Sequence, residues 1–239
     1  MKNSMLLFLL ITFSLQIYAQ ENHFPQLKKV VMDADMDVYV KYDASKSTLI
    51  QKKRSALPVN NPFRSNDEYD ADDILVLETC LEADCFEKYL VFYTPGMSAD
   101  PAFYIFNKSN PDSAIIGIGA LHLYITSNGF FYIDGHTNNT FNTRQKFRIQ
   151  KDEVKEVRQP FYYVGLKSKT KIPLTLYSDE NMTKEVAKLS AGSSIEVLLA
   201  DPAEYFRYLV KTSFGLVGWV EFEMVYLDDQ IEGLFFKGD

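Results

Sequence analysis

The sequence predicts an all-β protein in which an antiparallel β domain precedes a smaller β domain. Tyrosine and phenylalanine are abundant, with 15 and 18 residues, and aromatic side chains pack well on the pleated, half-buried surface of a sheet. Short apolar or alternating runs also follow one another along the chain with turn residues between them, as expected of strands joined by loops. Both observations favour strands over helices.

The first element along the chain is predicted to be a secretory signal peptide over residues 1–19. Lys2 precedes the apolar run MLLFLLITFSLQIYA, which ends at the small residue Ala19, and signal peptides have this order of segments. A membrane anchor is the alternative, but a bilayer core of about 30 Å needs about 20 apolar residues. We expect the mature chain to begin near Gln20, to be periplasmic or secreted, and to have no membrane span.

The charge of the chain argues against one class of partner. The formal net charge is -7, and removal of Lys2 with the signal peptide makes the mature chain more negative still. Proteins that bind nucleic acid need a positive surface that meets the phosphates. We therefore expect no nucleic-acid partner.

After the signal peptide, residues 20–166 are predicted to form the antiparallel β domain. In MDVYVKYD, Val38 and Val40 alternate with Tyr39 and Lys41, so the two sets face opposite sides of a strand. The runs ILVLE, KYLVFY and AFYIF are predicted to be further strands. The polar stretch SALPVNNPFRSNDEYDADD, which precedes these runs, is typical of a surface loop.

A longer apolar run, SAIIGIGALHLYIT, is predicted to be one central strand that is buried on both faces. Its glycines, Gly117 and Gly119, suggest a bend or the close approach of another backbone. Asn-Gly at residues 128–129 supplies the positive φ angles of a tight hairpin turn, so HLYIT and FFYID are predicted to pair. The Lys-Asp turn at residues 151–152 continues the same meander.

Cys80 and Cys85 are predicted to form a disulfide. They lie between two strand-like runs, DILVLETC and CFEKYLVFY, so the four residues between them would form a hairpin loop that brings the sulfurs within bonding distance. The oxidising environment outside the cytoplasm favours the bond. A loop this short gains little stability from it.

The polar stretch GLKSKT, residues 165–170, predicts the boundary between the two domains. Beyond it, LTLY, KLSAGSSIEVL and YLVKTSFGLVGWV follow in order, with Gly192 and Gly215 at turns and the single tryptophan, Trp219, in the last strand. In order and spacing, residues 170–228 resemble the bacterial SH3-like domain family, a small five-stranded barrel.

That resemblance implies a recognition module, often found beside cell-wall enzymes, that binds peptidoglycan peptides or other protein segments. Tyr177, Tyr208 and Trp219 are the candidate binding residues, because aromatic side chains line grooves that recognise peptides. The alternative for Trp219 is a buried ring that fills the small core.

Two shorter features complete the second half of the chain. A short helix is predicted near ENMTKEVAK, with Asp179 as its cap. The tail over residues 229–239 contains IEGLFFKGD, which is too apolar for a solvent-exposed end, so we expect it to pack back on a domain.

One set of residues resembles that of papain-like cysteine cell-wall hydrolases: Cys85 as nucleophile with His122 and His136. In those enzymes the cysteine begins a helix, where the thiol pKa is lowered, whereas DCFEKYLVF alternates like a strand.

The acidic run DADMD lacks the glycine and glutamate that a calcium loop places after it. We therefore expect no metal and no cofactor.

Taken together, these patterns predict a periplasmic or secreted, non-catalytic binding protein whose second domain recognises a cell-wall peptide or an envelope protein segment. Two alternatives stay open. A structural two-domain envelope protein would unfold in one cooperative transition. A cysteine hydrolase that uses Cys85 with His122 and His136 would lose its activity on Cys85→Ala.

Overall fold

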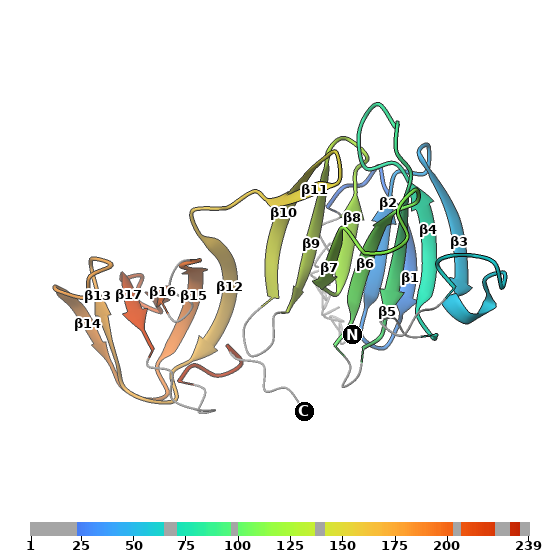
Figure 1. The fold of residues 1–239 in the computed structure, drawn as a ribbon. Coiled ribbons are helices and arrows are strands. Elements are labelled where there is room, and N and C mark those ends of the chain that lie inside the picture. The colour runs from blue at the N-terminus through green and yellow to red at the C-terminus, as the bar shows by residue number, and fades with distance from the viewer. Residues whose placement is uncertain are drawn as a thin grey trace, which may run out of the picture.

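The computed structural model describes residues 23–64, 71–96, 100–136, 142–202, 207–222 and 230–234. The fold is all-β, as predicted, and consists of three sheets (Figure 1). The predicted signal peptide, residues 1–19, lies outside the described residues. Within the described ranges, no helix has the length and apolar character needed to cross a membrane.

The first sheet has six strands and combines both ends of the N-terminal half. In spatial order they are β1 (Lys28–Asp33), β2 (Val38–Tyr42), β8 (His122–Ile125), β9 (Phe130–His136), β10 (Asn142–Gln150) and β11 (Glu153–Glu156). The hairpin predicted at residues 128–129 is confirmed as β8–β9, and the turn at 151–152 joins β10 to β11.

The pairing of β2 with β8 corrects the expectation of a purely antiparallel domain, because these two strands run parallel, with Tyr39 beside His122 and Tyr42 beside Ile125. A parallel pair needs a long crossover connection. Here the connection is the whole second sheet. Its five strands follow in chain order: β3 (Ser47–Lys53), β4 (Ile74–Thr79), β5 (Tyr89–Thr94), β6 (Ala102–Asn107) and β7 (Ile116–Gly119).

The predicted single strand SAIIGIGALHLYIT is wrong: the run forms β7 and β8, which belong to different sheets. The chain crosses between the sheets at Ala120 and Leu121. A Cβ atom on Gly135 of β9 would lie 2.6 Å from the backbone nitrogen of Leu121, so glycine is required where the crossing chain passes. At Gly117 the close neighbour is a side chain and not the predicted backbone, since a Cβ there would lie 2.7 Å from the Tyr104 ring.

The core of the N-terminal half lies between the first two sheets. Its buried residues come from inward positions of both sheets and include Val38, Val40, Val91, Ile105 and Leu123. The alternation in β2 is therefore as predicted. Face-to-face packing of this kind places every second residue of each strand in the core.

The second sheet is also covered on its outer face, by residues 54–64. Leu57 and Phe63 of this segment pack on Phe92 and Phe106 and form a separate buried cluster. The first part of the predicted surface loop is thus a covering layer, because its apolar side chains close over the sheet. As a result β5, which carries Phe92, is buried on both faces.

A buried charge pair anchors this covering layer. Arg54 and Asp73 are each only 2% exposed, and Arg54 Nε lies 3.4 Å from Asp73 Oδ2. The guanidinium also donates a hydrogen bond of 3.1 Å to the carbonyl oxygen of Phe63 and lies 4.0 Å from the centre of the Phe92 ring. Burial of both charges is tolerated only because they meet each other and further partners.

The C-terminal half forms the third sheet, which lies beside the β10–β11 edge of the first sheet (Figure 1). All of its pairs are antiparallel. In spatial order its six strands are β12 (Tyr162–Lys169), β15 (Ser194–Ala200), β16 (Arg207–Thr212), β17 (Val217–Glu221), β13 (Leu174–Tyr177) and β14 (Glu185–Leu189).

In this third sheet β12 and β14 stand at the two ends of the order, and no closed barrel is found in the part of the chain that the structure describes. One apolar core serves the sheet, including Leu176, Val197 and Val210. Ile231 and Leu234 of the tail lie fully buried in the same core. Phe235 and Phe236 lie outside the described residues.

Two local expectations for this half differ from the structure. Residues 165–170 belong to β12 and its end, and the chain passes from the first to the third sheet at residues 157–161. The predicted helix is absent, because residues 185–189 pair with β13 as strand β14. Asp179 instead closes the turn ahead of β14, where its carboxylate accepts hydrogen bonds from the backbone N–H groups of Thr183 and Lys184.

Candidate functional site

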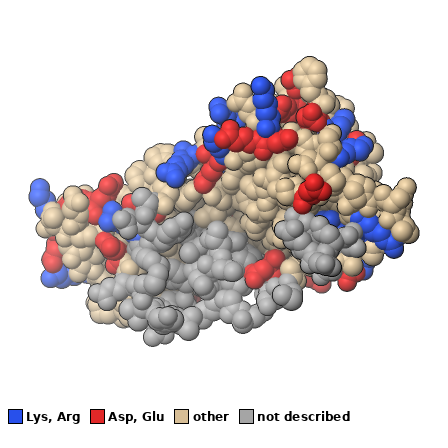
Figure 2. All heavy atoms as spheres, in the orientation of Figure 1, with Lys and Arg blue, Asp and Glu red and all other residues tan. Residues whose placement is uncertain are grey.

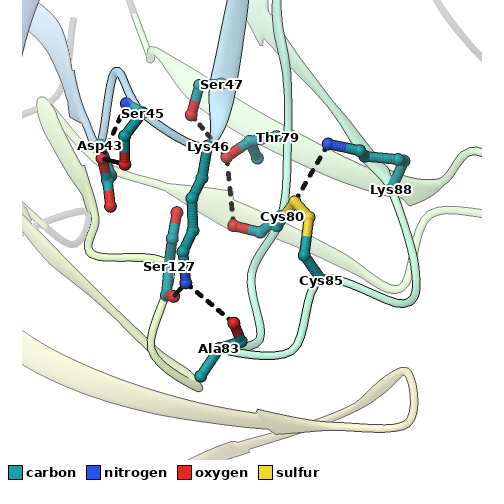
Figure 3. The surroundings of a disulfide bond; sticks show 10 residues. All are labelled: Asp43, Ser45, Lys46, Ser47, Thr79, Cys80, Ala83, Cys85, Lys88 and Ser127. Carbon is teal, nitrogen blue, oxygen red and sulfur yellow. Dashed lines mark hydrogen bonds between the residues drawn. A yellow bond between two sulfur atoms is a disulfide. The ribbon is translucent and has the colours of Figure 1, made fainter.

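Cys80 and Cys85 form a disulfide, as predicted (Figure 3). The bond closes part of the loop between β4 and β5. This loop is longer than the predicted four residues, because β5 begins only at Tyr89. Cys80 is fully buried, and Lys88 Nζ lies 3.1 Å from its sulfur. The only nucleophile that the sequence suggested is therefore held in a covalent bond.

A lysine fastens the disulfide loop to the rest of the N-terminal half. The Nζ atom of Lys46 donates hydrogen bonds of 3.0 Å to the carbonyl oxygens of Ala83 and Ser127 (Figure 3). Ala83 lies inside the loop, whereas Ser127 lies in the turn between β8 and β9. The disulfide loop is thus part of a structural contact between the first two sheets.

The residues of the hydrolase alternative do not form a catalytic set. The sulfur of Cys85 is bonded to Cys80. His122 lies on β8, with its ring stacked on Tyr39 at 4.0 Å between centroids and its Nε2 atom 3.0 Å from the carbonyl oxygen of Asp37. His136 ends β9, and its side chain lies outside the described residues.

The polar neighbours of His122 form a small network on the outer face of the first sheet. His122 Nδ1 lies 3.6 Å from Asp134 Oδ2, and Arg144 Nε lies 3.4 Å from the same oxygen. Burial alone would raise the pKa of the Asp134 carboxyl, but its contacts with His122 and Arg144 outweigh burial and lower that pKa. The carboxylate is therefore a charged anchor for both side chains.

The acidic turn DADMD is closed by hydrogen bonds between the Asp33 side chain and the backbone of the turn. The carboxylate of Asp33 accepts hydrogen bonds from the N–H groups of Asp35 and Met36, at 2.9 and 3.0 Å. Across the described ranges, no group of three or more histidine, cysteine, aspartate or glutamate side chains is placed to hold a metal ion.

The structure separates the three aromatic residues that the sequence placed in one groove. Tyr208 is fully buried in the core of the third sheet, where its ring lies 5.5 Å from that of Phe222. Burial raises the pKa of the Tyr208 phenol. Tyr208 therefore serves the core and does not line an open groove.

Trp219 and Tyr177 lie on the other face of the same sheet. Tyr177 of β13 pairs with Trp219 of β17 in register, and paired residues of an antiparallel ladder point to the same side. Trp219 is 8% exposed, and its ring lies 5.7 Å from that of Phe161 in the connection to the first sheet. Trp219 is thus buried between the outer face and this connection.

The same sheet carries a hollow that the sequence did not predict, and we call it the lysine-lined hollow. Its volume is about 670 Å³, which lies within the usual range for ligand sites. It is lined by Lys167, Ser168, Lys169, Ser194, Ile195, Glu196, Lys211, Thr212, Ser213 and Glu232.

Charges of both signs alternate across this hollow. Lys167 of β12 pairs in register with Glu196 of β15, which pairs in turn with Lys211 of β16. Lys211 Nζ lies 3.0 Å from Glu196 Oε2. Figure 2 shows the same mixture of basic and acidic side chains over the third sheet, at the left of that view. A surface of this kind suits a ligand with both carboxylate and amino groups.

A sequence signal for the hollow was present in GLKSKT. Lys167 and Lys169 alternate with Leu166 and Ser168, and this period of two is typical of a strand with a basic outer face. Interpretation of the stretch as a linker hid this signal.

Comparisons of the chain with protein-family models, curated proteins and solved structures gave no match.

Proposed function

We propose that this chain is a non-catalytic binding protein that works outside the cytoplasm, and that its third sheet recognises a cell-envelope ligand, either a peptidoglycan peptide or a protein segment. The observation that carries the proposal is the lysine-lined hollow. Its cations and carboxylates lie on neighbouring strands, an arrangement that complements a short peptide carrying charges of both signs.

One further observation supports this function in two ways. The disulfide between Cys80 and Cys85 suits an oxidising compartment such as the periplasm or the extracellular space. The same bond occupies the sulfur that a cysteine hydrolase would need as a thiolate. Binding therefore explains the site better than hydrolysis does.

The test is co-sedimentation of the purified mature chain with peptidoglycan sacculi, followed by calorimetric titration with soluble stem peptides. Lys167→Glu reverses one charge in the hollow, and we expect the affinity to fall at least about tenfold, or about 1.4 kcal/mol. Lys184→Glu is the matched control, because Lys184 is exposed in the turn ahead of β14, outside the hollow.

The control variant should bind as the unmodified chain does. Failure of the mature chain to bind sacculi, stem peptides and envelope protein extract would contradict the proposal. Equal loss of affinity in the hollow variant and in Lys184→Glu would also contradict it, since net charge alone would then explain the effect.

A further inference from the structure

The outer face of the first sheet has an unusual composition for a surface. One face of an antiparallel sheet commonly meets solvent and carries polar side chains. Here five of the positions that alternate with core residues on β2, β8 and β9 carry aromatic rings, and Lys41 and Asp134 occupy two others. The rings are those of Tyr39, His122, Tyr124, Phe130 and Tyr132. We call this surface the aromatic face.

The chain just ahead of β1 folds onto the aromatic face and builds one wall of a pocket. The ring of Phe24 lies 4.8 Å from that of Tyr132 and 5.3 Å from that of Tyr124, tilted in both cases. The carbonyl oxygen of His23 accepts a hydrogen bond of 3.0 Å from Lys41 Nζ. The rings of Phe24, Tyr124 and Tyr132 therefore form one packed cluster, in which Tyr124 is buried.

Lysine ammonium groups lie over rings of the aromatic face. Lys146 Nζ lies 3.9 Å from the centre of the Phe130 ring and 5.7 Å from that of Tyr132. Lys29 Nζ lies 3.8 Å from the centre of the Tyr39 ring. Contact with the ring faces orients these ammonium groups. Carboxylates lie on the same surface, since Lys29 Nζ is 3.5 Å from Asp37 Oδ1.

The pocket itself is a hollow of about 610 Å³ between the aromatic face and the connection to the third sheet. Phe24, Tyr124 and Tyr132 line its apolar part, and Lys146 and Arg158 bring positive charge. Arg144 and Asp134 also line the pocket but pair with each other at 3.4 Å. Residues 157–160 form the opposite wall. This wall is fixed in place, because Gln159 Nε2 donates a hydrogen bond of 2.6 Å to the carbonyl oxygen of Arg144.

The chemistry of the pocket selects among ligands. The C–H groups on the flat side of a sugar ring pack on aromatic rings, and a carboxylate on the sugar pairs with lysine or arginine. Gln145 and Gln159 also line the pocket. Their Nε2 atoms donate to Glu156 and to the carbonyl oxygen of Arg144, and their amide oxygens suit hydroxyl donors. A neutral ligand would gain nothing from Lys146 and Arg158, and a nucleic acid needs a wider positive surface than a chain of net charge -7 offers.

We propose that this pocket binds an acidic oligosaccharide, with one sugar ring on the rings of Phe24 and Tyr132 and its carboxylate at Lys146 and Arg158. The pocket belongs to the first sheet and the connection, whereas the lysine-lined hollow belongs to the third sheet. The proposal therefore does not depend on the proposed function.

The experiment is calorimetric titration of the full mature chain with tetrasaccharides of galacturonate and of mannuronate. A neutral galactose tetrasaccharide and a short single-stranded oligothymidylate are titrated in parallel. We expect at least one acidic tetrasaccharide to bind, with an affinity that falls as salt is added because the carboxylate contact is screened. We expect at least tenfold weaker binding of the neutral sugar and of the oligothymidylate.

Variants distinguish the pocket from the general surface. Lys146→Glu and Tyr132→Ala should each weaken binding at least about tenfold, whereas Tyr132→Phe keeps the ring and should bind within about twofold of the unmodified chain. Lys52→Glu is the matched control, because Lys52 is exposed on β3 of the second sheet. Unchanged thermal unfolding of each variant excludes a general loss of fold.

Four outcomes would overturn the proposal. These are no binding of either acidic tetrasaccharide, equal binding of the neutral one, tighter binding of the oligothymidylate, and equal effects of Lys146→Glu and Lys52→Glu. A loss of acidic sugar binding in Lys146→Glu with sacculus binding retained would separate this pocket from the lysine-lined hollow.

Discussion

The two halves of the molecule bury their strands in different ways. In the N-terminal half two sheets face each other and a third layer, residues 54–64, covers the second sheet, so β5 is enclosed on both sides. In the C-terminal half a single sheet packs its inner face on one core, which residues from the chain's tail complete. The first half therefore depends on layers and on a buried charge pair, and the second on one apolar cluster.

This difference can be measured separately in each half, because the single tryptophan, Trp219, lies in the third sheet. Its fluorescence reports unfolding of the C-terminal half. Hydrogen exchange of peptides from β4 and β5 reports opening of the N-terminal half.

The largest effect is expected from Asp73→Ala, which leaves the charge of Arg54 buried without its partner. Removal of one member of a buried pair costs about 3–5 kcal/mol. Hydrogen exchange in β4 and β5 should accelerate accordingly. Asp72→Ala is the control, because its bond to Lys53 is on the surface and such pairs contribute about 0–1 kcal/mol. Equal effects of the two variants would show that the buried pair does not anchor the covering layer.

The next effect is expected in the other half, from Leu176→Ala. Leu176 is fully buried in the core of the third sheet, and truncation of a buried leucine costs about 2–5 kcal/mol. The midpoint of the Trp219 fluorescence transition in urea should fall, while exchange in β4 and β5 stays unchanged. Leu216→Ala, at a side chain that is 40% exposed, is the control. If β4 and β5 lose protection together with Trp219, the two halves unfold as one unit, as the structural alternative predicts.

The smallest effect is expected from loss of the disulfide through Cys80→Ala combined with Cys85→Ala. The bond closes a very short loop, for which the chain-entropy model gives about 2 kcal/mol. The free energy of unfolding should fall by this amount in the N-terminal half alone, measured by exchange in β4 and β5. A shift of the Trp219 transition of the same size would show that the halves are coupled.

Much of the local structure could be predicted from the sequence. The alternation of Val38 and Val40 with Tyr39 and Lys41 gave the two faces of β2, and the Asn-Gly pair at 128–129 gave the β8–β9 hairpin. These predictions succeeded because strand faces and tight turns depend on neighbouring residues.

Partners distant in the chain were not predictable in the same way. The run that contains β7 and β8 is equally apolar whether it forms one buried strand or two strands in different sheets. Only the parallel pairing of β8 with β2 decides the matter. The aromatic face was hidden for the same reason, because Tyr39 and Tyr124 become neighbours only through that pairing.

The error at Tyr208 had a local signal. Tyr208 lies two positions before the apolar Val210 on the same strand, so both side chains point to the same side. The structure places both in the core. Trp219, which pairs with Leu209 of β16 in register, faces the other way. A consistent use of the strand period would have kept Tyr208 out of the candidate site.

The parallel pair β2–β8 also determines the order in which the molecule can be completed as it is made. The β1–β2 hairpin leaves the ribosome first, but β8 follows only after all five strands of the second sheet. Until then, one side of β2 exposes unpaired N–H and C=O groups, and such an edge invites pairing with other chains.

The second sheet faces a related delay, since its inner residues Val91 and Ile105 wait for β8, β9 and β10 before a complete opposite sheet exists. The two sheets therefore pack together late in folding, because their contacts join distant parts of the chain, and long-range pairing of this kind is slow. A nascent chain that stops before β8 is prone to aggregate. A holding chaperone would therefore protect the chain most before β10, which ends at residue 150, has emerged.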